Sequence, residues 1–319
     1  MAKIPCFLMC KSRTPARIKK KIKLTAEGIL TVCLARNSGV MSGLRANGGS
    51  GFDYRISQAI ADRLNLELDP VWFEVDIDKE VNATETTYAM LSYGLCDLVP
   101  AHPLYENAVG APSEPHGLLP RWVGLHEEQD PETGHRRTKK TPLVKLQDVA
   151  VSHPYYRTEI GLVFSEGTPE PQDLQSLGDR RLAIQSTTLS GVIVHMQAPE
   201  ETRAGSVTFT PGKKFLWELE AGKADIAIVD VADYDAHLKQ NPISRLKLAG
   251  WRHPIGFDIG IAALAENAAL LQRVNDILDT LLEDGTIEAL AEAEGLHYSA
   301  PKSAEIAPLM TMKMLREIR

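Results

Sequence analysis

The chain of 319 residues lacks several features that define large classes of protein. No apolar run is long enough to span a bilayer. There is no excess of positive charge either, because 35 Lys and Arg stand against 42 Asp and Glu and give a formal net charge of -7. Proteins that hold phosphate backbones or anionic membranes use clustered cations. We therefore expect neither nucleic acid nor an anionic membrane surface among its partners.

Cysteine is also scarce, with four residues in the whole chain. Cys6 and Cys10 have no second Cys or His pair downstream that would complete a zinc site. Cys33 and Cys96 lie in two predicted strands, the first and the third, which are commonly neighbours in a doubly wound sheet. A disulfide between them is sterically possible and would indicate an oxidising compartment. Two buried free thiols are the alternative.

The start of the chain lacks the order of a signal peptide. A short apolar patch at residues 4–9 precedes the basic residues instead of following them. Those basic residues are Lys11, Arg13, Arg17, Lys19, Lys20, Lys21 and Lys23. We expect residues 1–27 to form a disordered basic segment, and a mis-assigned start or a cloning remnant would give the same pattern.

A repeated pattern is present, Leu-x-x-Gly-x-x-Asp followed by Leu or Ile, at residues 91–98 and 219–226. In each copy the Gly stands where a helix C-terminus needs a left-handed residue. The apolar run after Asp97 or Asp225 is typical of a buried parallel strand. Two copies, in a chain long enough for about two domains, predict two similar α/β lobes.

Hydrophobic periodicity and turn residues predict the elements of both lobes. In the first lobe we expect strands at 30–35, 66–75 and 96–101, helices at 54–65 and 86–93, a glycine-rich loop at 37–50 and a long surface loop at 111–147. Pro70 places a break or an edge in the second strand. In the second lobe we expect strands at 159–164, 181–185, 206–209, 224–230 and 246–251, and helices at 188–196 and 213–221. A strand at 257–264 and helices at 268–282 and 286–293 follow.

These elements predict how the chain is divided. We expect lobe 1 at residues 28–157 with a surface insertion at 111–147, lobe 2 at 158–253, a return to lobe 1 at 254–304 and a C-terminal tail at 305–319. The tail carries Leu309, Leu315 and Ile318 beside three methionines, which is typical of a docking helix, and a disordered end is the alternative.

Several motifs in this order resemble the type II periplasmic solute-binding proteins of the polar amino-acid-binding class, extracellular solute-binding family 3. The resemblance covers roughly residues 28–300. Its motifs are Gly51-Phe52-Asp53, the two Gly-x-x-Asp repeats, Val151-Ser-His-Pro-Tyr-Tyr156, and Asp284-Gly-Thr286 followed by Gly295. The resemblance implies two doubly wound α/β lobes joined by a two-strand hinge. It also implies a periplasmic monomer without catalytic residues, cofactor or metal, which captures a small polar solute for the permease of an ABC-type transporter or for a receptor.

One departure from the family concerns the ligand. The family places an Arg after the third strand to clamp a carboxylate, whereas residues 100–107 contain none. Neither His102 nor Asn107 supplies the planar guanidinium fork that a bidentate clamp needs. An ordinary α-amino acid is therefore not the ligand that this segment predicts.

The missing Arg, the pair Cys33 and Cys96, and Pro154-Tyr-Tyr-Arg-Thr158 resemble a narrower subgroup, encoded with quinoprotein methanol and alcohol dehydrogenases. That likeness implies an alternative function as an accessory protein of a periplasmic PQQ-dependent dehydrogenase, with a modified or unused cleft and the insertion as a docking surface. A second alternative is a dehydratase-like enzyme on the same scaffold, with Glu106 as its acid.

Ligands of open α/β sheets lie beyond the carboxyl ends of the strands, and two facing lobes bring two such edges together. This rule selects Asn37, Ser38, Phe52, Asp53, His102 and Tyr105 from lobe 1, Gln185, Ser186, Thr187, Thr188, Asp230 and Asp233 from lobe 2, and Arg157 beside the hinge.

Most of these candidates also have an ordinary structural role open to them. Either residues 185–188 hold a polar ligand group at a helix N-terminus, or Ser186 or Thr187 only caps that helix. The resemblance gives Asp230 the role of pairing with a ligand ammonium, and capping the next helix is its alternative. His102 either hydrogen-bonds a ligand or is a satisfied loop histidine, and Arg157 either contacts the ligand or braces the hinge.

Overall fold

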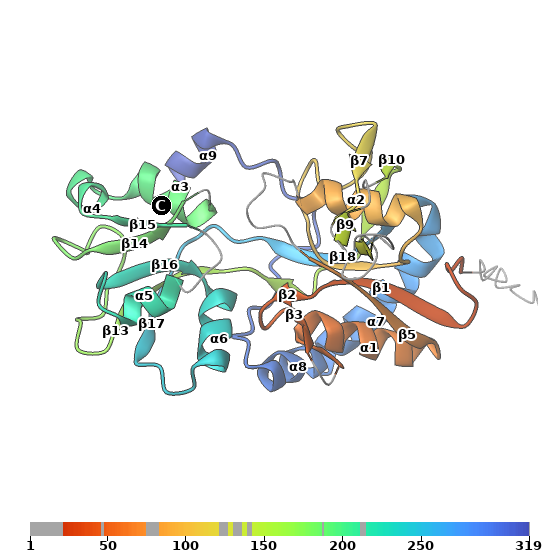
Figure 1. Ribbon diagram of the computed structural model, residues 1–319, viewed down its shortest axis with the longest axis horizontal. Helices are drawn as coiled ribbons and strands as arrows, with labels where there is room; N and C mark the ends of the chain where they lie inside the picture. Colours follow the sequence, from red (N-terminus) through yellow and green to blue (C-terminus); the bar gives the residue numbers. More distant parts are fainter. Residues whose placement is uncertain are drawn as a thin grey trace, which may run out of the picture.

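The chain folds into two α/β lobes that lie side by side along the longest axis of the molecule (Figure 1). The computed structural model describes residues 22–45, 48–74, 83–120, 127–129, 136–138, 142–186, 188–210 and 215–318. Each lobe has a central sheet with an apolar core on both faces. The prediction of two doubly wound lobes is confirmed.

The sheet of lobe 1 is built around β1. Its strands are β1 (Ile29–Ala35), β5 (Glu67–Phe73), β6 (Val99–Pro103), β18 (Asp258–Leu264), β11 (Val149–Val151) and β12 (Tyr156–Arg157). β5 runs parallel to β1, and the Cys33 amide donates to the Leu98 carbonyl just before β6, with an N···O distance of 3.0 Å. β18 pairs antiparallel with β6, β11 and β12. β5 pairs with β1 only, and an edge strand tolerates Pro70.

Alternate residues of β1 point into two separate cores. Leu30, Val32 and Leu34 pack against three helices, α1 (Phe52–Leu64), α7 (Ala268–Glu283) and α8 (Thr286–Glu294). Cys33 faces the other way, toward α2 (Ala83–Tyr93). The short 3-10 helix η1 (Ala265–Asn267) leads into α7. The period of two in β1 therefore fixes which helices cover which face.

The predicted glycine-rich loop at 37–50 is wrong in its described part, because it forms a small antiparallel sheet. Its strands are β2 (Asn37–Ser38), β3 (Ser42–Arg45) and β4 (Gly48–Ser50). Gly51 follows with a φ of +101°, and a Cβ there would lie 2.7 Å from the Met41 carbonyl oxygen. Only glycine fits this junction, which sets the start of α1.

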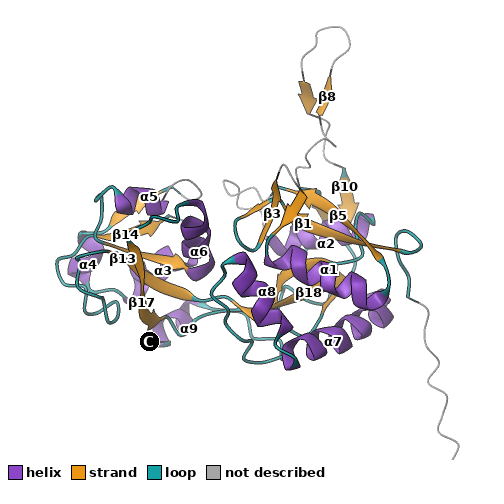
Figure 2. Cartoon of the chain, turned by 90° about the horizontal axis from the view of Figure 1, so that it is seen from below, coloured by secondary structure: helices purple, strands orange, loops and turns teal. Residues whose placement is uncertain are grey.

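The described parts of the insertion are ordered. β7 (His116–Leu118) and β10 (Leu143–Lys145) form an antiparallel ribbon, and Val144 and Leu146 pack with Tyr88 and Met90 of α2. Beyond the ribbon, β8 (Glu127–Gln129) and β9 (Arg136–Thr138) pair as a hairpin that projects from lobe 1 (Figure 2). Strands of three residues are too short for periodicity to reveal them in the sequence.

Lobe 2 has a five-stranded sheet in the order β15-β14-β16-β13-β17. The strands are β15 (Val207–Phe209), β14 (Leu182–Gln185), β16 (Ile226–Asp230), β13 (Ile160–Ser165) and β17 (Leu246–Arg252). The helices are α3 (Leu189–Gln197), α4 (Glu200–Ala204), α5 (Phe215–Glu220) and α6 (Val231–Gln240). α3 contributes to the core on one face of the sheet, and α5 and α6 contribute to the core on the other.

The two copies of the sequence repeat perform the same structural task. Gly94 and Gly222 both have a φ of +76° and end a helix. The Asp97 carboxylate then accepts the Thr31 amide at 3.0 Å, and the Asp225 carboxylate accepts the Arg181 amide at 2.9 Å. In each lobe the repeat therefore ties the approach to one strand to another strand of the same sheet, β1 in lobe 1 and the start of β14 in lobe 2.

The chain passes between the lobes three times. Residues 157–160 and 252–258 form the predicted hinge, and they run so close together that a Cβ on Gly256 would overlap the Thr158 carbonyl oxygen. The third passage is the C-terminal tail, which ends in α9 (Met312–Glu317) docked on lobe 2 (Figure 1). Of the two predictions for the tail, the docking helix is the one observed. Among the described residues, no helix has the length and apolar character needed to cross a membrane.

Cys33 and Cys96 form a disulfide, with a Cα–Cα distance of 5.6 Å and a sequence separation of 63. Both are buried where β1 lies beside the approach to β6. Of the two alternatives that the sequence left open, the disulfide is the one present.

Replacing both cysteines in Cys33→Ser/Cys96→Ser should lower the free energy of unfolding by about 2–5 kcal/mol, because a long loop loses its cross-link in the unfolded chain. Urea unfolding with and without reductant measures the effect. Replacing Cys6 and Cys10, which lie outside the described residues, is the control and should change nothing. Free-thiol titration of the unreduced, unfolded protein should find two thiols, and finding four would contradict the disulfide.

Candidate ligand-binding site

The two lobes touch at the edges predicted to hold a ligand. A Cβ built on Gly39, in the turn after β2, would lie 2.8 Å from the Cβ of Ala236 in α6. Ala232 and Ala236 of α6 also pack against the core of lobe 1. Figures 1 and 2 both place α6 beside lobe 1. Asn37 and Ser38 therefore lie in the lobe 1 segment that meets α6.

Asp230 ends β16 and caps α6, because its Oδ1 accepts the Ala232 amide at 2.9 Å. Burial raises the pKa of this carboxyl to about 7, and the negative charges of Asp233, Asp235 and Glu159 act in the same direction. Asp233 lies in the first turn of the same helix. Desolvation raises its pKa, although the side chain remains exposed to solvent.

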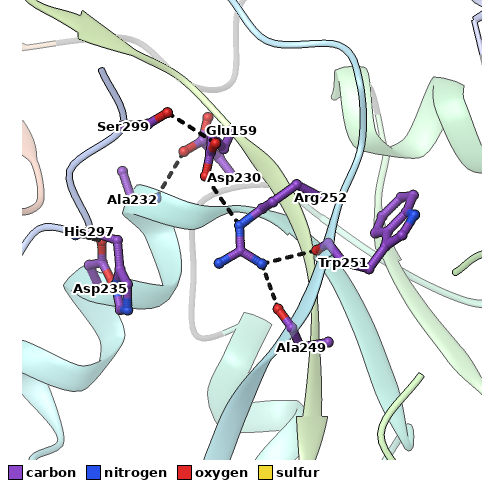
Figure 3. Close-up of polar contacts among 9 residues, drawn as sticks. All are labelled: Glu159, Asp230, Ala232, Asp235, Ala249, Trp251, Arg252, His297 and Ser299. Atoms are coloured by element: carbon purple, nitrogen blue, oxygen red, sulfur yellow. Dashed lines mark hydrogen bonds and ion pairs between the residues drawn. The ribbon is translucent and has the colours of Figure 1, made fainter. Parts of the chain in front are cut away.

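The other acids of this group have partners (Figure 3). Glu159 pairs with Arg252 at 3.1 Å and accepts the Ser299 hydroxyl at 3.0 Å. Asp235 accepts the His297 amide at 2.7 Å and also bonds the His297 ring. Among the described residues, no cation lies within ion-pair distance of Asp230. The cluster therefore has a negative charge that its own described side chains leave uncompensated.

Tyr156, which the sequence supplied only as part of a motif, belongs to the same group. It lies on β12 with 1% of its surface exposed, and its hydroxyl has no hydrogen-bond partner among the described residues. Burial raises the pKa of this hydroxyl. Neighbouring negative charges raise it further, and Asp230 has the largest effect among them. An unsatisfied buried hydroxyl costs about 1–3 kcal/mol and is rare in folded proteins. The Tyr156 hydroxyl therefore stands out among the buried polar groups.

Phe52 and Asp53 belong to the core of lobe 1. Phe52 is 0% exposed, and its ring centroid lies 5.7 Å from that of Tyr155 and 5.8 Å from that of Tyr156. The Tyr155 hydroxyl donates to Asp53 Oδ1 at 2.6 Å and accepts the Ala101 amide at 2.8 Å. Burial raises the pKa of Asp53 to about 7, and the Tyr155 hydrogen bond offsets part of that rise. These two residues join α1 to the hinge and to β6.

The remaining candidates of lobe 1 and the hinge are held by their own neighbours. His102 is 2% exposed, and its Nε2 lies 2.6 Å from the Ala108 carbonyl. Burial lowers the pKa of His102 to about 4, so the ring is neutral and Nε2 donates to that carbonyl. The ring of Tyr105 packs on Phe257 at 5.8 Å. Arg157 pairs with Asp258 at 3.2 Å, which braces the hinge.

The segment after β14 in lobe 2 is a helix cap. Thr188 Oγ1 accepts the Gly191 amide at 3.2 Å and donates to the Gln185 carbonyl at 2.8 Å, so Thr188 is the N-cap of α3. The Ser186 hydroxyl lies 3.3 Å from the Phe209 carbonyl. Thr187 lies outside the described residues. The sequence indicated the cap but placed it at Ser186 or Thr187, which precede Thr188.

Comparison with known proteins supports the fold. No protein family model matches the chain. The substrate-binding domain 2 of Lactococcus lactis GlnP, in an open conformation, superposes with a TM-score of 0.57 and 16% identity over 86% of this chain and 97% of that one. The unliganded open L-cystine solute receptor of Neisseria gonorrhoeae gives a TM-score of 0.55 and 19% identity over 87% and 97%. The architecture is the type II periplasmic binding protein fold.

One curated relative is similar in sequence. The ABC transporter arginine-binding protein 1 of Escherichia coli (strain K12) is 24% identical over 151 residues. The match covers 46% of this chain and spans 60% of the relative's length. Identity at this level, over part of the relative, leaves the ligand of this chain to be argued from its own residues.

Asp53 gives a prediction for stability against pH. Its pKa in the folded protein is raised from 3.8 to about 7, so the protonated carboxyl favours the folded state and that contribution is lost as pH rises through this range. The free energy of unfolding of the unaltered protein should therefore fall, relative to Asp53→Asn, between about pH 4 and pH 7 and run parallel to it above. Denaturant titrations across this range measure the difference. Asp62→Asn, an exposed site on the same helix, should show no such change.

Proposed function

We propose that this protein binds a small polar solute between its two lobes without transforming it, and presents it to the permease of an ABC-type transporter or to a receptor. The uncompensated carboxylate of Asp230, at the edge where the lobes touch, is the observation that carries the proposal. The fold supports it, because the two solved proteins superposed above are a substrate-binding domain and a solute receptor.

The charge around Asp230 favours a ligand with an ammonium or guanidinium group. A cation would stabilise the ionised form of a carboxyl that burial and neighbouring acids disfavour. Glu159 and Asp235 are engaged by Arg252 and His297, so Asp230 and the adjacent Asp233 are the acids left for a ligand. The arginine-binding relative from Escherichia coli is named for a ligand of this charge.

A periplasmic location fits this proposal. The disulfide between Cys33 and Cys96 needs an oxidising compartment. The proposed exchange with a permease or receptor would take place outside the cytoplasmic membrane.

The two alternative functions have less support. None of the similarities described above concerns a protein associated with a quinoprotein dehydrogenase, so the accessory role stays a prediction from the sequence. A dehydratase-like reaction would need Glu106 as an acid in the cleft, but Glu106 is exposed and accepts the Leu309 amide at 3.2 Å. Neither alternative makes use of the uncompensated charge at Asp230.

Asp230→Asn should weaken binding of a cationic solute by about 2–5 kcal/mol, or on the order of 30-fold to several thousand-fold in Kd. Asparagine is as good an N-cap as aspartate, so the substitution removes the charge and keeps α6 capped. Titration calorimetry with arginine, glutamine, cystine and simple amines measures the affinities. The control is Asp179→Asn, at an exposed site in lobe 2. Unchanged affinity in Asp230→Asn would remove Asp230 from the site, and no binding by any member of the panel would contradict solute capture.

The same group predicts how binding depends on pH. Because the pKa of Asp230 is raised to about 7, the carboxyl is largely protonated below that pH and ionises above it. Affinity for a cationic solute should therefore rise with pH, by up to about tenfold per unit below pH 7, and level off above. Calorimetry from pH 5 to pH 8.5 checks the profile, and Asp230→Asn should flatten it. A profile that falls with rising pH would contradict an ionised Asp230 as the ligand's partner.

A further inference from the structure

Residues 299–318 form a C-terminal tail that contacts the hinge and both lobes. Where it starts, the Ser299 carbonyl accepts the Arg157 amide at 3.0 Å, and Ser299 Oγ donates to Glu159 (Figure 3). The next residues bind Asp258, because the Lys302 and Ser303 amides donate to its carboxylate at 3.1 and 3.0 Å. The tail thus follows the hinge before it reaches either lobe surface.

The middle of the tail is fastened to lobe 1. Ala307 pairs in parallel with Tyr105, because its amide donates to the Leu104 carbonyl at 2.9 Å and its carbonyl accepts the Glu106 amide at 2.8 Å. The Leu309 amide adds a bond to the Glu106 carboxylate. Residues 104–106 directly follow β6, so the anchor lies at the edge of the lobe 1 sheet from which ligand-binding residues were predicted.

The end of the tail is fastened to lobe 2. Leu315 of α9 is 5% exposed and lies in the apolar core that contains Ile193 and Val194 of α3. The Gln197 side-chain amide donates to the carbonyls of Leu315 and Ile318, at 2.5 and 2.9 Å. The helix also has its own cap, since Thr311 accepts the Met314 amide at 3.2 Å. α9 therefore packs as an integral part of lobe 2.

The two anchors are close together along the chain. Ala307 belongs to the lobe 1 anchor, and Thr311 starts the helix bound to lobe 2. An extended chain covers at most about 3.5 Å per residue, so these two points cannot separate by more than roughly 14 Å while both anchors hold. A rotation of the lobes about the hinge that moved these points farther apart would have to break one anchor.

We propose that residues 299–318 act as a strap that limits how far the two lobes can open. It joins the lobe 1 edge at residues 104–106 to α3 of lobe 2, alongside the two hinge segments. Wide opening requires either α9 to leave its apolar site or Ala307 to separate from Tyr105, and narrow motion requires neither. The strap follows from contacts within the chain and does not depend on the identity of any ligand.

Distance measurements between spin labels on the two lobes test the strap in the full-length chain. Labels at Glu283→Cys on α7 and Ala204→Cys on α4 occupy exposed sites, with Cys6 and Cys10 replaced by serine and the native disulfide kept. Leu315→Asp puts a charge into the lobe 2 core and should raise the undocked population of α9 on the order of 30-fold, the factor that matches burial of one leucine side chain. Undocking should add a longer-distance component to the interlobe distribution.

The matched control is Met312→Asp, the same kind of change on the same helix at a side chain that is exposed, and it should leave the distribution unaltered. Hydrogen exchange of residues 307–318 reports independently whether α9 has undocked. Gln197→Ala removes the amide bonds from the lobe 2 side and serves as a second variant if Leu315→Asp disturbs folding. If α9 undocks in either variant and the interlobe distances stay as they were, the strap proposal is wrong.

Discussion

The arrangement of the two lobes depends on the contact between the two hinge segments. The Thr158 amide donates to the Phe257 carbonyl at 2.8 Å, and the Phe257 amide donates to the Thr158 hydroxyl at 2.9 Å. Gly256 leaves no room for a side chain against the Thr158 carbonyl. The segments therefore cross as one unit, and β13, β17 and β18 extend from it into the two sheets. This crossing brings α6 of lobe 2 against the β2 turn of lobe 1.

Side-chain ion pairs hold that second contact. Glu294 of α8 is buried and binds Lys239 of α6 at 2.6 Å and Arg55 of α1 at 2.9 Å. Burial opposes its ionisation, but the two cations outweigh burial and lower its pKa. Among the described residues, Glu294 is paired with a cation from the other lobe and Glu159 with Arg252 at the hinge. Asp230 differs because no described cation is paired with it. Its carboxylate instead caps α6 at the end of β16.

The sequence predicted those parts of the fold that depend on local backbone geometry. Gly94 and Gly222 mark helix ends by their left-handed conformation, and Asp97 and Asp225 follow at a fixed spacing, so the repeat identified two lobes. Strand adjacency made a disulfide between Cys33 and Cys96 possible and left two buried free thiols as the alternative. What the sequence could not give depends on contacts between distant residues. The packing of Phe52 on Tyr155 and Tyr156, and the choice of α3 as the surface on which α9 docks, leave no periodic trace.

The same distinction explains why the candidate site was predicted only in outline. The rule about strand ends picks positions, whereas the charge balance at a position depends on what the other lobe and the tail bring to it. Ser299 of the tail binds Glu159, and His297, just before the tail, binds Asp235, which leaves Asp230 without a described counter-charge. The strap thus begins at Ser299, which is one of the two residues that bind acids between the lobes. Under the proposed function, ligand affinity and lobe geometry are therefore coupled through residues 297–318, because moving the tail would alter both.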